Sequence, residues 1–177
     1  DPIAFNRFVQ MHSSRVYSIA YRIVGNADEA KDIAQEVFVR LYQSIHQYDS
    51  RYSFNSWVYR IAVNLSIDHH RREARHRKIS STNSQTESMP DNDSVRPDVD
   101  TERRELMGTI EQLTSDLSPS QRKVFVLRDL QGFGATEISS ILKCSENTVR
   151  VHLSNARQKI KTALLEIYPD LNGDYTI

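Results

Sequence analysis

The sequence predicts an all-helical protein built as two small domains. Apolar residues recur at helical spacing through most of the chain. Turn-forming residues are scarce, with 5 Gly and 5 Pro in 177 residues, whereas an all-β protein needs many turns. Apolar residues make up 38% of the sequence, which is enough to give each of two small domains a buried core.

The first two predicted helices are separated by Gly25 and Asn26. The first covers residues 5–24, and its apolar positions at helical spacing are Phe5, Phe8, Val9, Val16, Ile19, Ala20 and Ile23. Asn26 can cap the second helix, whose first turn carries Asp28 and Glu29. The inward positions predicted for that helix are Ala30, Ile33, Ala34, Val37, Phe38, Leu41 and Ile45.

A third helix is predicted after a polar loop at residues 48–53. Its inward positions are Phe54, Trp57, Val58, Ile61, Ala62 and Leu65. The helix ends in a basic run at residues 71–78. The three helices together predict one compact domain over residues 1–78.

A flexible acidic linker is predicted between this domain and a second one. Residues 79–100 carry almost no apolar side chains, so they cannot bury enough surface to offset the entropy of ordering. We place the linker at 79–105 and the second domain at 106–177. Residues 1–78 hold 12 basic and 8 acidic residues, residues 79–116 hold 3 and 9, and residues 117–177 hold 8 and 6. Basic blocks around an acidic connector favour two domains that face nucleic acid.

The second domain carries the pattern of a helix-turn-helix. Ser118, Pro119 and Gln121 predict a capped helix start. A short helix at about 136–142 is followed by a turn and by a second helix at about 146–162, for which Ser145 is the predicted cap. The buried stripe of that second helix is Val149, Leu153, Ala156 and Ile160.

The opposite face of the last helix has side chains suited to reading DNA. The predicted DNA-binding residues there are Asn147, Thr148, Arg150, Val151, Ser154 and Arg157. Arginine can bind a guanine edge, asparagine an adenine edge, and valine a thymine methyl group, while Thr148 can hold a phosphate. The alternative is an ordinary helical hairpin whose polar face is merely solvated.

Two features of the first domain remain open from the residues alone. The basic run at 71–78 fits either a solvated helix end or phosphate binding. Tyr48 and Tyr52 lie in a polar loop, where they could stack on unpaired bases, whereas Trp57 and Phe54 are expected to pack in the core.

Enzymatic, metal-binding and membrane roles find little support. Cys144 is the single cysteine, so no internal disulfide is possible and a reducing cytoplasm is the simplest setting. His69, His70 and His76 lack a second ligand pair, so we expect no metal and no cofactor. No catalytic motif is present, and no apolar run approaches the roughly 20 residues of a membrane span.

Several motifs, in order along the chain, resemble the sigma-70 family of RNA polymerase sigma factors. Residues 28–38, DEAKDIAQEVF, are similar to the family's second region, which residues 54–64 and 68–72 continue. Residues 117–122 and 148–153 resemble its fourth region. Two such domains with a short linker resemble the extracytoplasmic-function (ECF) group. Lys143 stands where the family's turn commonly has Gly.

This resemblance implies a role in transcription initiation and a division of labour within it. The clamp helices of the polymerase's largest subunit would bind the face of Asp28, Asp32, Gln35, Glu36 and Arg40. The loop residues Tyr48, Arg51, Tyr52 and Phe54 would capture a base flipped from the non-template strand of the −10 promoter element. Asn64, Arg71 and Arg72 would hold the DNA just upstream. The last helix would read the −35 element, and an anti-sigma factor would hold the protein inactive.

Two other functions are kept as alternatives. A helix-turn-helix regulator would share the C-terminal motif but would act on an operator without polymerase. A metal-dependent nuclease using His69 and His70 is the enzymatic alternative.

Overall fold

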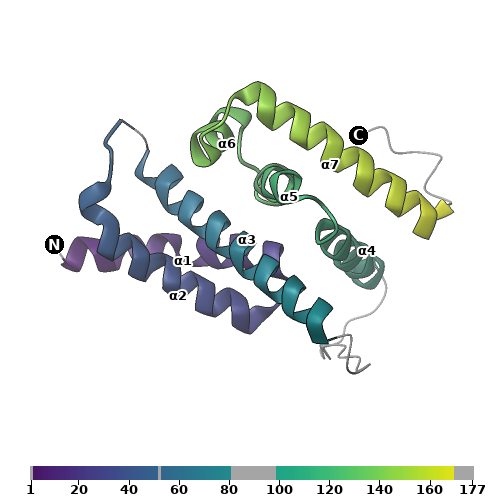
Figure 1. Ribbon diagram of the computed structural model, residues 1–177, viewed down its shortest axis with the longest axis horizontal. Helices are drawn as coiled ribbons and strands as arrows, with labels where there is room; N and C mark the ends of the chain where they lie inside the picture. Colours follow the sequence, from purple (N-terminus) through teal and green to yellow (C-terminus); the bar gives the residue numbers. More distant parts are fainter. Residues whose placement is uncertain (1, 52, 81–98, 170–177) are drawn as a thin grey trace.

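The computed structural model describes residues 2–51, 53–80 and 99–169, and every regular element in these ranges is a helix. Figure 1 shows α3 in the middle of the molecule, with α1 and α2 on one side and α5 and α6 on the other. The prediction of an all-helical protein is therefore confirmed.

The N-terminal unit consists of three long helices and one short turn of helix. These are α1 (Pro2–Val24), α2 (Ala27–Ser44), the 3₁₀ turn η1 (Ile45–Gln47) and α3 (Phe54–Ser80). Asn26 caps α2 as predicted, because its Oδ1 atom accepts hydrogen bonds from the amides of Asp28 at 2.9 Å and Glu29 at 3.1 Å. Gly25 provides the turn before the cap, with a φ of +76°.

The core of this unit comes from the predicted apolar stripes. The most buried side chains, each at most 3% exposed, include Val16, Ile19, Ile33, Val37, Leu41, Val58 and Ala62. The inward prediction for Ile45 was wrong, because 46% of this residue is exposed. The physical reason is that α2 ends at Ser44, and the tighter 3₁₀ turn that follows rotates Ile45 away from the buried stripe.

Over residues 99–169, the C-terminal unit contains four α-helices and one π-helical segment. They are α4 (Val99–Thr114), α5 (Pro119–Phe125), η2 (Val126–Leu130), α6 (Ala135–Leu142) and α7 (Glu146–Ile167). Helix α5 begins with the predicted capping box, in which Ser118 and Gln121 exchange hydrogen bonds of 3.3 and 3.4 Å. The side chain of Ser145 caps α7 by accepting from the amide of Thr148 at 3.0 Å.

A buried arginine holds the loop between α4 and α5. Arg122 is 5% exposed, and its guanidinium donates to the carbonyl oxygens of Thr114 at 2.9 Å, Leu117 at 3.2 Å and Ser115. Burial lowers the pKa of Arg122 to about 10, against the opposing attraction of Asp116. The side chain stays charged at neutral pH, and its donors satisfy carbonyl groups that helix ends and turns leave unpaired.

The helix-turn-helix closes through a left-handed residue. Lys143 ends α6 with φ +53° and ψ +50°, a conformation that glycine adopts more easily. The turn therefore keeps the geometry of the motif although the sequence has lysine at this position.

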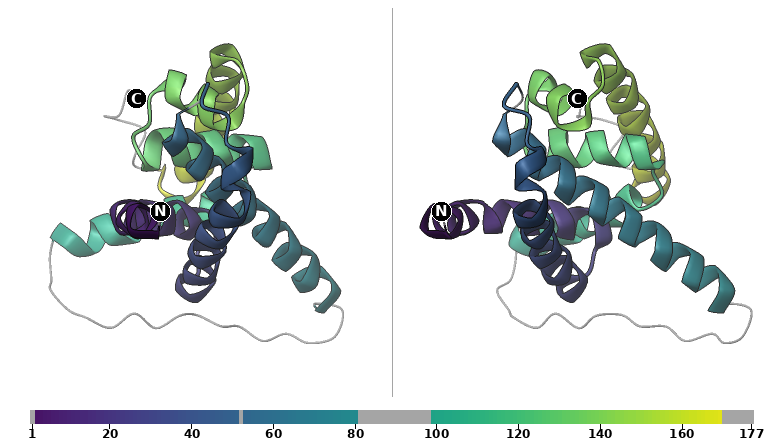
Figure 2. Two further views of the ribbon diagram at one scale, coloured as in Figure 1. Left: turned by 90° about the vertical axis from the view of Figure 1, so that its left-hand side faces the viewer. Right: turned by 60° about the vertical axis from the view of Figure 1, so that its left-hand side comes forward.

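The two units pack directly against each other (Figure 2). Phe133, Ile138 and Ile141 of the C-terminal unit belong to the same buried cluster as the core of α1–α3. The sequence had predicted separate modules on a tether, and it gave no indication of this shared core. The predicted linker falls mainly on residues 81–98, which lie outside the described residues, while α3 and α4 extend into its two ends.

The helices do not suggest a membrane-spanning segment. Across the described ranges, none combines the length and the apolar content that crossing a bilayer requires.

Candidate nucleic-acid interface

The outward face of α7 has the arrangement predicted for a recognition helix. Val149, Ala156 and Ile160 are at most 6% exposed and anchor the helix. The predicted DNA-binding residues Asn147, Arg150, Val151, Ser154 and Arg157 are exposed, and Thr148 is half-buried near the helix start. The face therefore presents guanidinium, amide, hydroxyl and methyl groups to solvent together.

Two arginines of this face are held by carboxylates. Arg150 lies 3.5 Å from Glu146, one turn earlier on α7. The guanidinium of Arg157 donates two hydrogen bonds, of 2.6 and 2.9 Å, to the carboxylate of Asp129. These bonds raise the pKa of Arg157 above its usual value. These contacts orient the guanidinium groups along the helix surface.

A shallow groove of about 470 Å³ runs along the same face. The side chains that line it are Arg150, Leu153, Ser154, Arg157, Gln158 and Lys161. Sequence reasoning missed Gln158 and Lys161, although both follow Ser154 at helical spacing and could have been found by extending the predicted face by two turns.

The loop before α3 is organised by an aromatic cluster and an ion pair. Tyr48 lies 5.0 Å from Phe54 and 5.5 Å from Trp57 between ring centroids, so its ring packs against α3. Arg51 is held by Asp49 through contacts of 2.6 to 3.0 Å, and its side chain remains 84% exposed. Tyr52, also predicted as a DNA contact, lies outside the described residues.

Asp49 lies close enough to the helix-turn-helix for the charge of Lys143 to affect the pKa of its carboxyl group. Hydrogen bonds from the side chain and backbone of Arg51 lower the pKa of Asp49 to about 2, and the charge of Lys143 contributes to the same shift. The loop of the N-terminal unit and the turn between α6 and α7 are therefore electrostatic neighbours.

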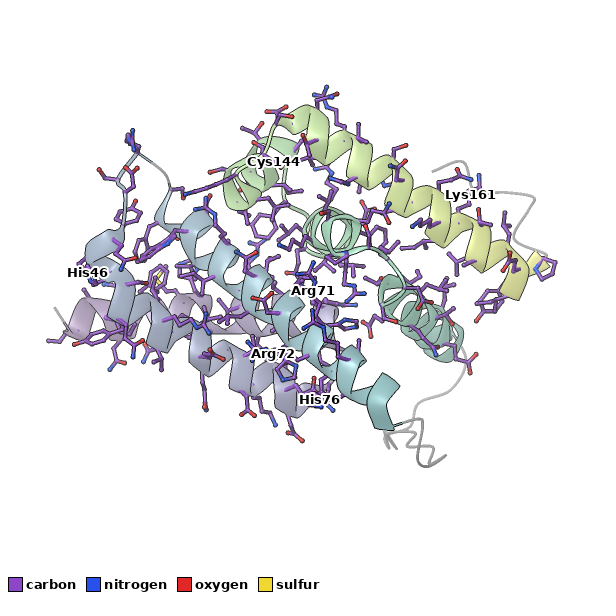
Figure 3. The ribbon with its side chains drawn as sticks, in the orientation of Figure 1. His46, Arg71, Arg72, His76, Cys144 and Lys161 are labelled. Atoms are coloured by element: carbon purple, nitrogen blue, oxygen red, sulfur yellow. The ribbon has the colours of Figure 1, made fainter. Side chains whose placement is uncertain are left out.

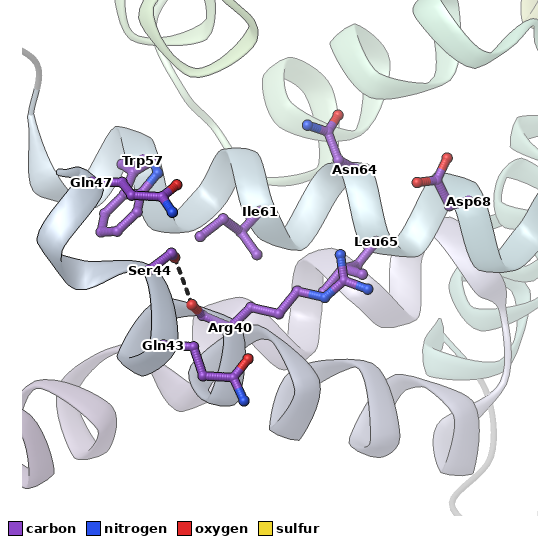
Figure 4. A pocket seen from close by; sticks show the side chains of 9 residues that line it. All are labelled: Arg40, Gln43, Ser44, Gln47, Trp57, Ile61, Asn64, Leu65 and Asp68. Atoms are coloured by element: carbon purple, nitrogen blue, oxygen red, sulfur yellow. Dashed lines mark hydrogen bonds between the residues drawn. The ribbon is translucent and has the colours of Figure 1, made fainter. Parts of the chain in front are cut away.

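A groove of about 450 Å³ lies between α2 and α3 (Figure 4). Its lining combines the aromatic Trp57 with polar side chains, and the full set is Arg40, Gln43, Ser44, Gln47, Trp57, Ile61, Asn64, Leu65 and Asp68. An aromatic wall with amide and guanidinium groups has the chemistry that binds an unstacked base. The family resemblance assigned Arg40 to the polymerase-binding face, and periodicity assigned Trp57 to the core. It missed Gln43 and Gln47 because it cannot show which polar residues of two helices face each other.

The predicted upstream DNA contacts lie along α3. Asn64 is exposed at one rim of the groove, and its Oδ1 atom accepts a hydrogen bond from Nζ of Lys123 at 2.9 Å. Arg71 and Arg72 are exposed further along the helix, with Arg71 on the side that faces α5 (Figure 3). The structure therefore brings Asn64 next to the groove and places the two arginines one to two turns beyond it.

The predicted polymerase-binding face forms one side of α2. Asp28, Asp32, Gln35, Glu36 and Arg40 are all exposed. Asp28 pairs with Lys31 at 3.3 Å, and Glu36 pairs with Arg40 at 2.5 Å. The opposite side of α2 is buried, so these charges are available to a partner without unfolding the helix.

The histidines of α3 do not assemble a metal site. His69 is half-buried, and its Nδ1 atom lies 3.3 Å from Glu29 without a hydrogen bond between them. In the part of the chain that the structure describes, no three His, Cys, Asp or Glu side chains come close enough to share a metal ion.

Comparison with known proteins places both units in one family. Residues 8–76 match the model for sigma-70 region 2, and residues 107–160 match that for sigma-70 region 4. The ECF RNA polymerase sigma factor SigW of Bacillus subtilis (strain 168) is 32% identical over 94% of this chain and 92% of its own length. The RNA polymerase sigma-H factor of Pseudomonas aeruginosa is 27% identical over 93% of this chain and 88% of that protein.

Solved structures share the fold. The sigma factor RpoE in complex with the anti-sigma factor NepR from Bartonella quintana has a TM-score of 0.67 at 18% identity, over 91% of this chain and 96% of that one. CnrH in complex with the cytosolic domain of CnrY has a TM-score of 0.65 at 21% identity, over 95% of this chain and 91% of that one. From the sequence matches over nearly its whole length, the chain belongs to the sigma-70 family and, within it, to the ECF RNA polymerase sigma factors.

Proposed function

We propose that this ECF sigma factor binds core RNA polymerase and directs it to promoters with a −35 and a −10 element. The observation that carries the proposal is the 32% identity to SigW over 94% of the chain, because it covers both units. A helix-turn-helix regulator acting without polymerase would share the C-terminal unit alone, so the rival function is not favoured.

Each surface has a proposed task. The exposed face of α7 reads the −35 element in the major groove, with Asn147, Arg150, Val151 and Ser154 nearest the bases. Thr148 and Arg157 hold its backbone. The exposed α2 face from Asp28 to Arg40 binds the clamp helices of the polymerase's largest subunit.

The groove between α2 and α3 supports a task in promoter opening. We assign to it a base flipped from the non-template strand of the −10 element, stacked near Trp57 and bonded by Asn64. We assign further contacts with the −10 element to the loop residues Tyr48, Arg51, Tyr52 and Phe54, and contacts with the upstream duplex to Arg71 and Arg72. Unstacking a base costs a few kcal/mol, which these contacts and polymerase must offset.

In this proposal the chain makes and breaks no covalent bond itself, and it needs no cofactor or metal. Polymerase performs the chemistry, so both act in the cytoplasm, where promoter DNA is found. The solved structure of the sigma factor RpoE contains the anti-sigma factor NepR, which supports an anti-sigma partner for this chain as well. We keep residues 1–78, 79–105 and 106–177 as the proposed domains.

Reconstituted transcription tests the proposal. Core polymerase with the purified chain is first used to select promoter fragments from a randomised DNA library, and a selected fragment is then transcribed in a run-off assay. We expect a transcript of defined length that requires both proteins. A folded, inhibitor-free chain that neither binds core polymerase nor gives a specific transcript would disprove the function. Binding to DNA without polymerase would favour the regulator.

A further inference from the structure

Two arginines of the outward face of α7 are held by carboxylates in different ways. Arg150 makes a single contact of 3.5 Å with Glu146 of its own helix. Arg157 donates from Nε to one carboxylate oxygen of Asp129 at 2.9 Å and from Nη2 to the other oxygen at 2.6 Å. Asp129 belongs to a different element, the π-helical segment η2. The guanidinium of Arg157 is therefore held in one orientation, whereas a single long contact at the surface restrains Arg150 only weakly.

The position of Asp129 is determined by the packing of the segment that carries it. Leu127, two residues earlier on η2, is fully buried. Phe125, about one turn before Asp129, packs in the same cluster as Ala156, the residue that precedes Arg157. Asp129 therefore lies on the side of the segment that faces α7. Its side chain is only 22% exposed, so the carboxylate has little room to turn away from Arg157.

The ion pair leaves the far end of the guanidinium available to a ligand. Asp129 takes up Nε and one hydrogen of Nη2, and within the part of the chain that the structure describes no other group accepts a hydrogen bond from Arg157. One hydrogen on Nη1 and one on Nη2 remain as a parallel pair in the plane of the group. Such a pair matches two oxygens of one phosphate. The side chain is 45% exposed, so a ligand can reach it.

The place of Arg157 along α7 favours a phosphate over a base edge. Arg157 lies about 10 Å beyond Arg150 along the helix axis, which is two turns. A recognition helix touches base edges with its N-terminal residues, so a side chain two turns later lies nearer the sugar–phosphate backbone that borders the major groove. Lys161 follows after one more turn and lines the same surface groove of the protein as Arg157. This end of the face therefore carries two cations suited to phosphates.

We propose that Asp129 is a positioning residue for DNA binding, which holds Arg157 so that its guanidinium binds one phosphate of the −35 duplex through two hydrogen bonds. The proposal rests on the proposed function, because it takes α7 to be the helix that reads the −35 element. Asp129 itself makes no contact with DNA. It orders the Arg157 side chain before the duplex arrives, which lowers the entropy cost of fixing a long side chain on binding. The contact adds affinity for all sequences alike.

Neutralising Asp129 separates positioning from simple charge. Removing a negative charge beside DNA would by itself strengthen binding, because phosphates repel carboxylates. We expect the opposite for Asp129→Asn in holoenzyme reconstituted with core polymerase. Its affinity for selected promoter fragments should fall about three- to ten-fold, by a similar factor on each fragment, in a filter-binding assay. Glu166→Gln neutralises an exposed carboxylate near the end of α7 and should not weaken binding. Unchanged or tighter binding by Asp129→Asn would overturn the proposal.

Two substitutions of Arg157 test the paired hydrogen bonds to a phosphate. Arg157→Lys keeps the charge but loses the planar pair of donors, so it should lose affinity as Asp129→Asn does. The slope of log Kobs against the logarithm of the salt concentration should stay the same in this variant. Arg157→Ala should make that slope shallower by about 1, as expected for the loss of one phosphate contact. Full affinity in Arg157→Lys, or a loss confined to one base pair of the −35 element, would contradict the phosphate contact.

Exchanging the two residues separates positioning from folding. Asp129→Arg with Arg157→Asp restores an ion pair between η2 and α7 but moves the cation to η2. We expect the urea midpoint to stay close to that of the native chain while promoter affinity stays low. Recovery of affinity together with stability would show that the pair only holds α7 in place, which would overturn the proposal. If the native chain gives no promoter-specific transcript, the proposed function fails and this proposal with it. A normal native transcript with full affinity in Asp129→Asn contradicts this proposal alone.

Discussion

At the scale of single residues, the turn of the helix-turn-helix carries a conformational cost. Lys143 is the only residue besides glycine with a positive φ in the ranges that the structure describes. A left-handed conformation costs an L-residue about 1–2 kcal/mol. The turn between α6 and α7 therefore contains local backbone strain at Lys143.

Replacing that lysine should stabilise the protein. We expect Lys143→Gly to raise the free energy of unfolding by about 1 kcal/mol, because glycine adopts φ +53° without a Cβ clash. Urea denaturation followed by circular dichroism measures the change. Gly132→Ala is the matched control, since Gly132 has φ +75° and should lose stability instead. An unchanged or lower midpoint for Lys143→Gly would contradict the strain argument.

Arg150 is the residue on which we expect the proposed reading of the −35 element to depend most. Arg150→Ala should weaken binding to a selected promoter by about 1–3 kcal/mol and relax the preference at one base pair. Its partner Glu146 is on the surface, so the fold should be unaffected. Lys159→Ala is the control, because Lys159 is also exposed but lies on a different side of α7 from Arg150. An equal loss on all DNA sequences would reassign Arg150 to a phosphate contact.

At the scale of single helices, α2 has one side that packs in the core and one side that is exposed to solvent. Ala30, Ile33, Val37 and Leu41 are buried on one side, and the predicted polymerase-binding charges are exposed on the other. Because the helix is amphipathic, substitutions on its exposed side should leave the packing of the core unchanged.

Charge reversal on α2 tests that division. Asp32→Lys with Glu36→Lys should reduce affinity for core polymerase at least ten-fold, because like charges would then face the partner surface. The helix content should stay the same. Glu105→Lys with Glu166→Lys, two exposed carboxylates on α4 and α7, serves as the control pair. Normal core affinity in the α2 variant would mean that another face binds polymerase.

The helix caps and the buried stripes could be predicted from the sequence because each depends on residues that are close together in the chain. The caps at Asn26, Ser118 and Ser145 and the buried stripes follow from residues three and four positions apart. Ile45 was predicted wrongly because the change from α-helix to 3₁₀ turn leaves the hydrophobic pattern itself unchanged. The groove between α2 and α3 was missed because pairing of polar positions depends on how the helices cross.

At the scale of the whole molecule, the contacts that join the two units could not be predicted from the sequence. Arg15 and Arg60 look like solvated helix residues, because the groups they bind are main-chain carbonyls of a distant unit. The shared core around Phe133 likewise follows from packing rather than from periodicity. The sequence could therefore indicate two modules but not their arrangement.

The shared core predicts that the two units unfold together. Trp57, the only tryptophan, reports on the N-terminal unit by fluorescence, while circular dichroism reports on all helices. We expect the two signals to give one coincident transition in urea, since separating the units exposes the cluster around Ile141. Arg15→Ala with Arg60→Ala should weaken this coupling. A fluorescence midpoint distinct from the circular dichroism midpoint in the native chain would contradict it.

Arg60 binds main-chain rather than side-chain acceptors, and this affects how freely the side chains of α6 can vary. A main-chain carbonyl is present whatever side chain a position carries, so substitutions in α6 leave the two acceptors of Arg60 in place. The helix-turn-helix can then diverge toward new target sequences without losing its attachment to α3. An arginine at position 60 therefore keeps α6 attached to α3 whatever side chains α6 carries.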